Sequence, residues 1–345
     1  METQNNRWTP ILLIFIFIAI AGLAYLQDSS PTASTTAQEQ AVTVIALSGP
    51  ITSPRAELSG MGWHNDMLIL LPQYPERFGD GDGALFALSK ADILAALDGT
   101  RQSPLEPTLI PLVAPGMKDL LKFFRGYKSI AFYNDQVFLT SESQQGTKTH
   151  GYLVSGKITP DSSKITLSTE KVVDIPITFP FAKRSDEAIL IKENLIFTFF
   201  EVNGSSLNPL PLAHVFDLNL NPQGIISFPS IEFRVTDAAT DLGNNFWVIN
   251  SFFPKDSDLA TTNDPLSQKY GKGPTHAKYN EVERLVELTY SPQGITLKDT
   301  APIQLTIDGN NSRNLEGLAL LDDKGFLLVT DKYPASMLLF VKMPK

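Results

Sequence analysis

Five segments of the chain repeat one pattern, and this repeat limits the fold more than any other feature. Each segment begins with an acidic residue or Ser, continues through small and apolar residues to a polar turn, and ends in a strongly apolar run. The segments span residues 57–71, 129–140, 187–200, 237–249 and 316–330. Apolar runs joined by turns rich in Asn, Asp and Gly are typical of β-hairpins. The repeat therefore predicts five hairpins in equivalent positions.

Most of the hairpins are followed by two further apolar runs. Residues 151–158 and 164–175 follow the second hairpin, and residues 213–220 and 224–233 follow the third. Four strands in a unit of about 50 to 75 residues is the size of a propeller blade. We therefore expect an all-β chain that forms a five-bladed β-propeller. The alternative is a six-bladed propeller, with a further blade in residues 252–288.

The last repeat contains only three strands before it ends at Met343. Residues 42–51, VTVIALSGPI, are apolar enough to supply the missing fourth strand. This pairing would close the propeller by joining the two ends of the domain. Helical periodicity is nearly absent, and residues 90–97, KADILAAL, form the one short candidate helix.

The amino-terminal end carries an unbroken apolar run over residues 11–26. Such a run is short for a membrane span, which needs about 20 residues, and suits a signal peptide with a small-residue cleavage site at residues 22–24. We expect residues 1–26 to be a signal peptide or a signal anchor, residues 27–40 a flexible tether and residues 41–345 the propeller. Either form predicts an extracytoplasmic protein that is periplasmic, secreted or anchored, touching a membrane only through residues 8–26.

The composition excludes several classes of protein. The chain has 345 residues with no Cys, which excludes disulfides, thiolate zinc sites and a cysteine nucleophile. Lys and Arg number 28 against 37 Asp and Glu, so the net charge is -9. A nucleic-acid-binding protein would present a basic face, and we therefore expect no nucleic-acid partner.

The starts of the five hairpins carry the candidate site. In a propeller the first strand of each blade lines the central channel, so the residues that open these strands should surround its mouth. These residues are Glu57, Ser129, Glu187, Asp237 and Glu316. Converging carboxylates either raise one another's pKa or require a cation, and oxygen ligands suit calcium. We predict a calcium site here; the alternative is that these acids cap strands or pair with Arg.

Arginines precede all five strand starts by two to four residues. They are Arg55, Arg125, Arg184, Arg234 and Arg313. Arg is the preferred residue for bidentate capture of carboxylate or phosphate. A ring of guanidinium groups would bind an anionic small molecule, whereas local salt bridges between blades are the alternative interpretation.

The second strand of each hairpin should end on the same face. Glu142, Glu201 and Asp331 stand at these ends and are candidate general bases. Residues 254–278 form a long polar insertion, which we interpret either as a lid or as a disordered excursion.

Two short motifs resemble those of a known family. Residues 58–63 with 67–71, and residues 314–319 with 327–331, are similar to blade signatures of the phytase-esterase-like propeller proteins. The placement of the residues that open the inner strands also resembles the calcium-binding ring of calcium-activated apyrases. The second resemblance implies calcium in the channel, held by the five positions named above, and hydrolysis of nucleotide phosphates. The chain departs from that pattern at Asp237, and the substrate residues of the apyrases have no match.

The leading hypothesis is an exported calcium-binding propeller that hydrolyses a phosphate or other ester at the channel face. Metal would polarise the ester and activate water, and the arginines would neutralise the anion. The second hypothesis is a non-catalytic ligand-binding or scaffold propeller in the cell envelope. A propeller fold alone does not decide between them.

Overall fold

The computed structural model describes residues 36–179, 181, 183–309 and 311–344. The chain divides into two compact units, Met1–Ala33 and Ser34–Lys345, and the account below concerns the second. The expected signal peptide or anchor and residues 27–35 of the expected tether lie outside the described residues. Within the described ranges, no helix combines the length and the apolar character that crossing a membrane requires.

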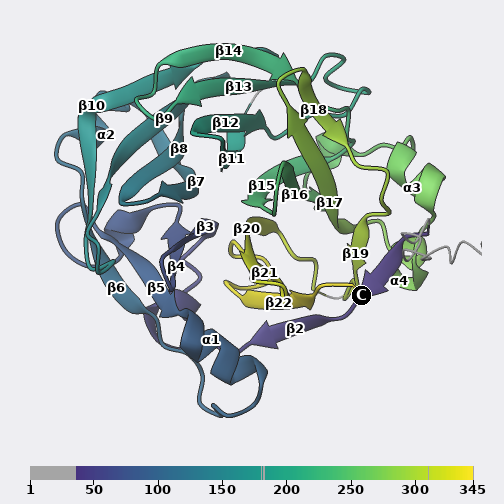
Figure 1. Cartoon of the computed structure of the whole chain (residues 1–345), viewed down its shortest axis with the longest axis horizontal. Coiled ribbons are helices and arrows are strands. Elements are labelled where there is room, and N and C mark those ends of the chain that lie inside the picture. The colour runs from purple at the N-terminus through teal and green to yellow at the C-terminus, as the bar shows by residue number, and fades with distance from the viewer. Residues whose placement is uncertain (1–35, 180, 182, 310, 345) are drawn as a thin grey trace, which may run out of the picture. The chain divides into compact units, whose positions relative to one another are not determined.

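The strands form four sheets, and the eight-stranded sheet consists of two groups of four strands. We therefore describe five groups of strands (Figure 1). The first group contains β3 (Leu58–His64), β4 (Met67–Pro72), β5 (Ala84–Ser89) and β6 (Thr108–Val113). The second contains β7 (Phe124–Tyr133), β8 (Gln136–Gln145), β9 (Lys148–Ile158) and β10 (Ile165–Ile175). The third contains β11 (Asp186–Lys192), β12 (Leu195–Phe200), β13 (Leu212–Asp217) and β14 (Pro222–Ser227).

The fourth and fifth groups incorporate strands from the start of the chain. The fourth contains β15 (Arg234–Thr240), β16 (Asn245–Phe252), β17 (Val282–Ser291), β18 (Gly294–Leu297), β19 (Ile303–Leu305) and β1 (Gln38–Gln40). The fifth contains β20 (Leu315–Leu321), β21 (Gly325–Thr330), β22 (Leu338–Lys342) and β2 (Val42–Ile45). The short helices are η1 (Gly49–Thr52), η2 (Pro75–Arg77), α1 (Lys90–Leu97), α2 (Met117–Leu120), η3 (Ser257–Leu259), α3 (Pro265–Tyr270) and α4 (Pro274–Lys278).

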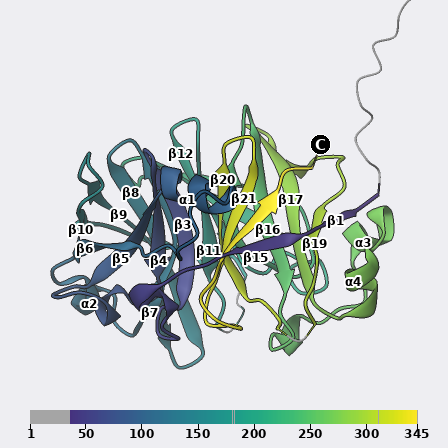
Figure 2. The same cartoon turned by 90° about the horizontal axis from the view of Figure 1, so that it is seen from below.

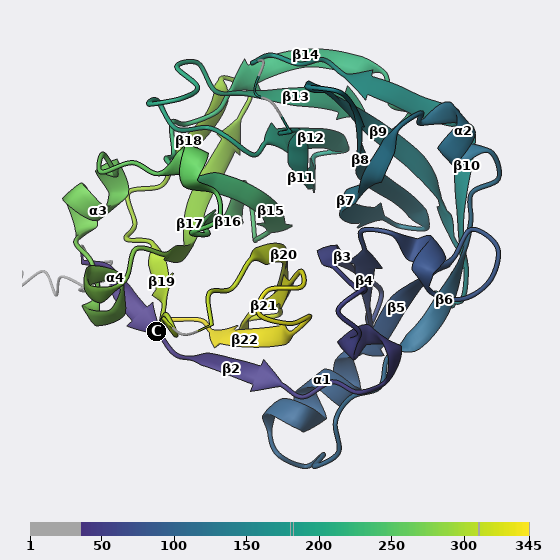
Figure 3. The ribbon, with the colours of Figure 1, turned by 180° about the vertical axis from the view of Figure 1, so that it is seen from behind.

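The first strand of each group faces the centre. These inner strands are β3, β7, β11, β15 and β20, and each contacts the inner strands of the groups before and after it, so that they close a ring (Figure 3). The prediction of an all-β propeller is confirmed. In the described residues, 252–288 form no additional four-stranded group, because they comprise the end of β16, η3, α3, α4 and most of β17.

The ring is closed by the start of the domain, as the apolar run at residues 42–51 predicts. β2 pairs antiparallel with β22, with Val42 opposite Val341 and Ile45 opposite Leu338. Residues 38–40, at the end of the expected tether, form β1, which pairs in parallel with β19. Figure 2 shows β1 and β2 following one another along the outer edges of the fourth and fifth groups.

The inner hairpin strands are apolar on both faces because each sheet packs against a neighbour on either side. Phe326, fully buried, meets Trp247 of the fourth group with ring centroids 5.1 Å apart. Phe199 stacks on Phe246 across the third and fourth groups at 5.7 Å. Burying one such ring contributes about 2–3 kcal/mol, so these contacts hold adjacent groups together.

The candidate helix at residues 90–97 is confirmed as α1. Its N-cap is Ser89, whose Oγ accepts a hydrogen bond from the Asp92 N–H at 3.1 Å. Capping of this kind satisfies one of the free N–H groups at a helix start.

The first two groups are joined into one eight-stranded sheet by the parallel pairing of β6 with β10. The repeat pattern of the sequence does not predict this pairing.

Candidate active site at the start of the inner strands

Every inner strand contains a β-bulge near its first residues. In β3, β11 and β20 one residue stands unpaired in the register, and in β15 two residues oppose one on its partner. β7 has two irregularities, one at Arg125 and Gly126 and one at Lys128. The bulged residues are Ser59, Lys128, Glu187, Thr236 with Asp237, and Glu316. Bulges re-aim side chains and are frequent next to active sites. This shared register defines which positions are equivalent in the five groups.

The five predicted calcium ligands do not occupy one ring. Glu187 and Glu316 are bulge residues, Asp237 is the second residue of the bulge in β15, and Ser129 follows the bulge in β7. Glu57 stands two residues before the bulge of its strand. Aligned on the bulges, Glu57 is displaced by two residues and Ser129 by one from the positions of Glu187, Asp237 and Glu316.

Glu57 lies apart from the other acids. Its Oε1 accepts a hydrogen bond from Arg77 Nη1 at 2.8 Å, and its Oε2 lies 3.3 Å from Lys332 Nζ. Its side chain is 15% exposed. Glu57 is thus paired with two cations, Arg77 and Lys332, that do not bind Glu187 or Glu316.

Ser129 and Asp237 pair with each other across the ring. A hydrogen bond of 2.8 Å joins Ser129 Oγ and Asp237 Oδ1, and the Leu318 N–H donates to Asp237 Oδ2 at 2.8 Å. Both side chains are buried. Burial raises the pKa of Asp237 to about 8, although these hydrogen bonds oppose the shift.

Arg234, at the start of β15, is the centre of the site. Its Nη2 donates to Glu187 Oε2 at 2.6 Å and to Glu316 Oε1 at 3.1 Å, so one nitrogen links two inner strands. Its Nε donates to Glu201 Oε2 at 2.9 Å, and its Nη1 donates to Asn314 Oδ1 at 2.9 Å. The side chain is 6% exposed. We call the group around it the charged cluster; its members are Lys128, Glu142, Arg184, Glu187, Glu201, Arg234, Asp256 and Glu316.

The five predicted arginines separate into three situations. Arg184 joins Arg234 in the charged cluster and binds Glu201 at 2.9 Å. Arg313 pairs with Glu283 away from that cluster. Arg55 and Arg125 are exposed. The structure therefore brings together two of the five.

Lys128 and Asp256 are the members of the charged cluster that the sequence pattern missed, and Lys128 is the one on an inner strand. Its Nζ lies 3.1 Å from Glu187 Oε1 and 3.8 Å from Glu142 Oε2. It occupies the bulge of β7, one residue before Ser129, so only the position of the bulge identifies it. Burial would lower the pKa of Lys128, but Glu187 and Glu142 outweigh it and raise that pKa, which keeps the ammonium charged.

Acids outnumber cations in the charged cluster. Its five carboxyl groups face three cations, so full ionisation would leave buried negative charge. Burial would raise the pKa of Glu187, but Lys128 and Arg234 outweigh it and hold that pKa well below the usual range. Burial raises the pKa of Glu316 to about 8, against the opposing effect of Arg234. The two carboxyls that share Arg234 thus differ in protonation at neutral pH.

Calcium does not fit this arrangement of residues. Among the described residues, no three His, Cys, Asp or Glu side chains are grouped so that they would hold a metal ion. The ammonium of Lys128 and the guanidinium of Arg234 already lie between the carboxylates. The calcium site stays a prediction from the sequence that this geometry does not favour.

Calcium is accordingly expected to leave the stability of the protein unchanged. A ligand that binds the folded state raises its stability by RT ln(1 + [L]/Kd), which is about 2.7 kcal/mol at a hundredfold excess over Kd. We expect the melting temperature of chelator-treated protein to be the same with and without millimolar calcium. A calcium-dependent rise that disappears in Glu187→Gln would restore the calcium site.

Stability should decrease as pH rises through the neutral range. The raised pKa values of Asp237 and Glu316, and of Glu201 at about 7, mean that the folded state binds more protons than the unfolded chain between about pH 4.5 and 8. Each such group lowers the free energy of unfolding by up to about 1.4 kcal/mol per pH unit in this window. Glu187 acts in the opposite sense, and only below its ordinary pKa.

Urea denaturation at several pH values measures this slope. Asp237→Asn provides the specific check, because the amide can keep both hydrogen bonds of the neutral acid without titrating. We expect this variant to unfold with a shallower pH dependence than the wild-type protein. An unchanged slope would show that Asp237 is ionised in the folded state.

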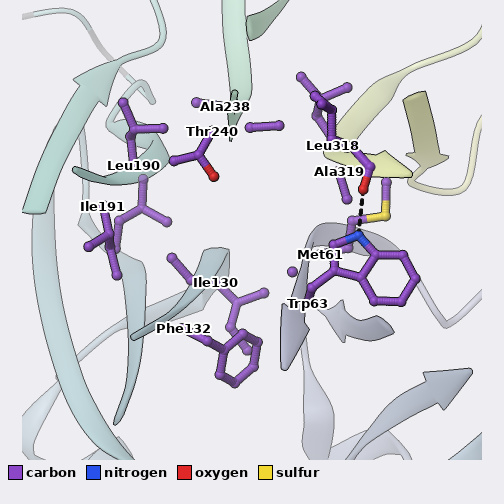
Figure 4. Close-up of a pocket in the computed structure, with 15 residues that line it drawn as sticks. Met61, Trp63, Ile130, Phe132, Leu190, Ile191, Ala238, Thr240, Leu318 and Ala319 are labelled. Atoms are coloured by element: carbon purple, nitrogen blue, oxygen red, sulfur yellow. Dashed lines mark hydrogen bonds between the residues drawn. The ribbon is translucent and has the colours of Figure 1, made fainter. Parts of the chain in front are cut away.

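The rest of the channel is apolar. Beyond the bulges, the inner strands enclose a cavity of about 160 Å³ lined mainly by aliphatic side chains and Phe132 (Figure 4). Trp63 lies at its edge, and its Nε1 donates to the Leu320 carbonyl at 2.7 Å. Titratable groups are therefore concentrated at the end of the channel where the inner strands begin.

Neither a known protein family nor a curated protein matches the sequence. Solved structures with a similar arrangement include the glutaminyl cyclase of Myxococcus xanthus, at 7% identity over 90% of this chain and 100% of that chain, with a TM-score of 0.43. A glycosyl hydrolase from Bacteroides ovatus is 11% identical over 90% of this chain and 95% of that chain, with a TM-score of 0.47. The GH62 α-L-arabinofuranosidase domain of Coprinopsis cinerea is 8% identical over 90% and 98%, with a TM-score of 0.45. At this level of similarity, the activities of those proteins say nothing about this chain, and its resemblance to phytase-esterase-like proteins and apyrases stays a prediction.

Proposed function

We propose that the protein is a hydrolase that cleaves a glycosidic bond with a pair of carboxyl groups, Glu187 and Glu316. The observation that carries the proposal is their shared bond to Arg234 Nη2, at 2.6 and 3.1 Å. Two bonds of these lengths to one nitrogen keep the two carboxyl oxygens within about 6 Å of each other. Retaining glycosidases place their carboxyls at a similar separation, about 5 Å.

The environments of the two acids suit different roles. Glu316 holds its proton at neutral pH and is the general acid that protonates the leaving oxygen. Glu187 is ionised and attacks the anomeric carbon, forming a covalent glycosyl intermediate. Glu316, now a carboxylate, then takes a proton from the water that releases the sugar. Atoms and charge balance in this sequence without a metal.

The charge of the site favours a neutral substrate. The predicted anionic ligand, and a phosphate ester in particular, would meet a cluster in which acids outnumber cations. Binding a sugar adds no charge to the buried cluster. Hydroxyl groups also suit carboxylates, which accept hydrogen bonds from them.

A second candidate is a non-catalytic propeller in which the charged cluster only joins the five groups. Its support is the thorough pairing and burial of the acids, since the side chain of Glu201 is 1% exposed and that of Glu187 is 7% exposed. A panel of aryl glycosides, carboxyl esters and phosphomonoesters, assayed from about pH 5 to 8 where the two acids differ in protonation, decides between the candidates. Turnover of glycosides supports the hydrolase, turnover of esters alone would replace its substrate class, and no turnover would favour the scaffold.

We also propose that the protein is exported, on the basis of the apolar run at residues 11–26. Fractionation of producing cells tests this, and mass spectrometry of the purified protein separates a cleaved signal peptide from a retained anchor. Recovery in the cytoplasm at full length would contradict export.

A further inference from the structure

The insertion at residues 254–278 encloses a large cavity with the fourth group of strands. The cavity measures about 970 Å³ and is floored by Phe233, Phe252 and Val282, which stand at the ends of β15, β16 and β17. Its other wall comes from the loop before η3 and from η3, α3 and the segments that follow. Figure 3 shows α3 and α4 beside this group. The size lies within the range of about 300–1,000 Å³ that is usual for small-molecule sites.

The wall formed by the insertion is fixed, which differs from both interpretations made from the sequence. Arg284 of β17 binds Asp264 through two hydrogen bonds of 2.8 and 2.9 Å, and its side chain is only 1% exposed. Gly273 N–H donates to Gln304 Oε1 at 2.7 Å, and Ala37 N–H donates to the Tyr270 carbonyl at 2.9 Å. A segment held by a buried bidentate ion pair and by a hydrogen bond from Ala37, which directly precedes β1, is neither a hinged lid nor a disordered excursion.

The cavity combines aromatic surface with uncharged hydrogen-bonding groups. Phe233, Phe252 and Tyr279 supply rings, and the polar lining includes Thr261, Ser267, Gln268 and Asn280. The charge of Asp264 is already neutralised by Arg284. Rings pack against the C–H faces of a sugar, while hydroxyl and amide groups bond its hydroxyls. The lining also includes Lys272, and as a whole it suits a carbohydrate better than a lipid, whose apolar chain would leave these polar groups unpaired.

The cavity adjoins the charged cluster through the backbone. Phe233 of its floor directly precedes Arg234, and Pro254 of its wall lies two residues before Asp256, which binds Arg184 at 3.2 Å. The cavity therefore lies at the same end of β15 as Arg234, which binds both Glu187 and Glu316. We infer that this cavity is a carbohydrate-binding subsite that holds the part of the substrate beyond the cleaved bond. The inference deepens the proposed function and rests on it.

The experiment fills the cavity and measures binding separately from hydrolysis. Ala260 is exposed and lines the cavity, so Ala260→Trp should occupy it without disturbing the core. Gln268→Ala and Asn280→Ala remove exposed amides from the lining, and Gln223→Ala removes an exposed amide from β14 as the matched control. Melting temperatures verify that each variant is folded.

Binding of p-nitrophenyl glycosides and of unsubstituted disaccharides is measured by calorimetry, and hydrolysis of the same glycosides is measured in parallel. We expect Ala260→Trp to raise Kd and KM at least about tenfold, and each amide variant about threefold to tenfold, with no change in the control. If Ala260→Trp hydrolyses glycosides as the wild-type protein does, the subsite is refuted and the proposed function stands. If the wild-type protein binds saccharides but hydrolyses none, and Ala260→Trp loses this binding, the cavity is a carbohydrate site and the proposed function is refuted. If the wild-type protein neither binds nor hydrolyses them, both proposals are refuted.

Discussion

Glu316→Gln is expected to reduce kcat on any glycoside that the wild-type protein cleaves by about 10³-fold, with little change in KM. The amide keeps the shape of the neutral acid and its bonds to Arg234 and Asn314 but has no proton to give to the leaving oxygen. The pH profile supplies a second readout. Because the pKa of Glu316 is raised to about 8, wild-type kcat/KM should fall as pH rises past that value.

Glu57→Gln is the matched control. It makes the same change at an acid that the repeat pattern treats as equivalent, but Glu57 is bound by Arg77 and Lys332 instead of Arg234. We expect its activity to stay within about threefold of wild type. Glu187→Gly should be as inactive as Glu316→Gln and should recover with azide, which replaces the missing nucleophile. Full activity in Glu316→Gln would refute the assignment of the general acid.

Arg234→Met is expected to lower the free energy of unfolding by about 3–5 kcal/mol, because it leaves buried carboxyls without their guanidinium partner. Arg234 binds Glu187, Glu201 and Glu316 together, so all three lose a partner at once. The loss should be smaller in acid. There the carboxyls of the folded variant can take up protons, which removes their buried negative charge, so the missing guanidinium matters less.

Urea denaturation at about pH 5 and pH 8, between which Glu201 titrates, measures both effects. Arg125→Met is the control, since Arg125 also lies at the start of an inner strand but is exposed, and we expect a change within about 0.5 kcal/mol. Adding Glu201→Gln to Arg234→Met should recover part of the stability, because one buried charge is removed with its partner. Equal losses in the two arginine variants would contradict the central role of Arg234.

The hairpins were predictable because their turns carry local chemistry. Asn134 with Asp135, and the residues around Gly325, favour turns whatever surrounds them. Closure of the ring by residues 42–45 was equally predictable, because an apolar run without a partner strand would pair with the group that lacks its fourth strand. The hairpins depend on residues close together in the sequence, and the closure depends on an apolar run that the repeat pattern leaves without a partner.

The site was only partly predictable because a bulge shifts the strand without changing its apolar pattern. Glu187 and Glu316 lie at strand starts, where the repeat pattern places them. Lys128 directly precedes Ser129, and only the bulge in β7 determines which of the two side chains joins the charged cluster. Arg234 and Arg313 both stand three residues before their acids, yet Arg234 enters the charged cluster and Arg313 pairs with Glu283. Which acid a long side chain meets depends on contacts across the ring.

The pairing of β2 with β22 has a consequence for biosynthesis. The two strands are separated by nearly the whole domain, so the ring cannot close until the residues of β22 have left the ribosome. Until then β2 remains an unpaired apolar strand at the start of the nascent chain, open to chaperones and to strands of other copies. Synthesis of β22 is thus the step that lets the ring close, and newly made chains are most vulnerable to aggregation just before it.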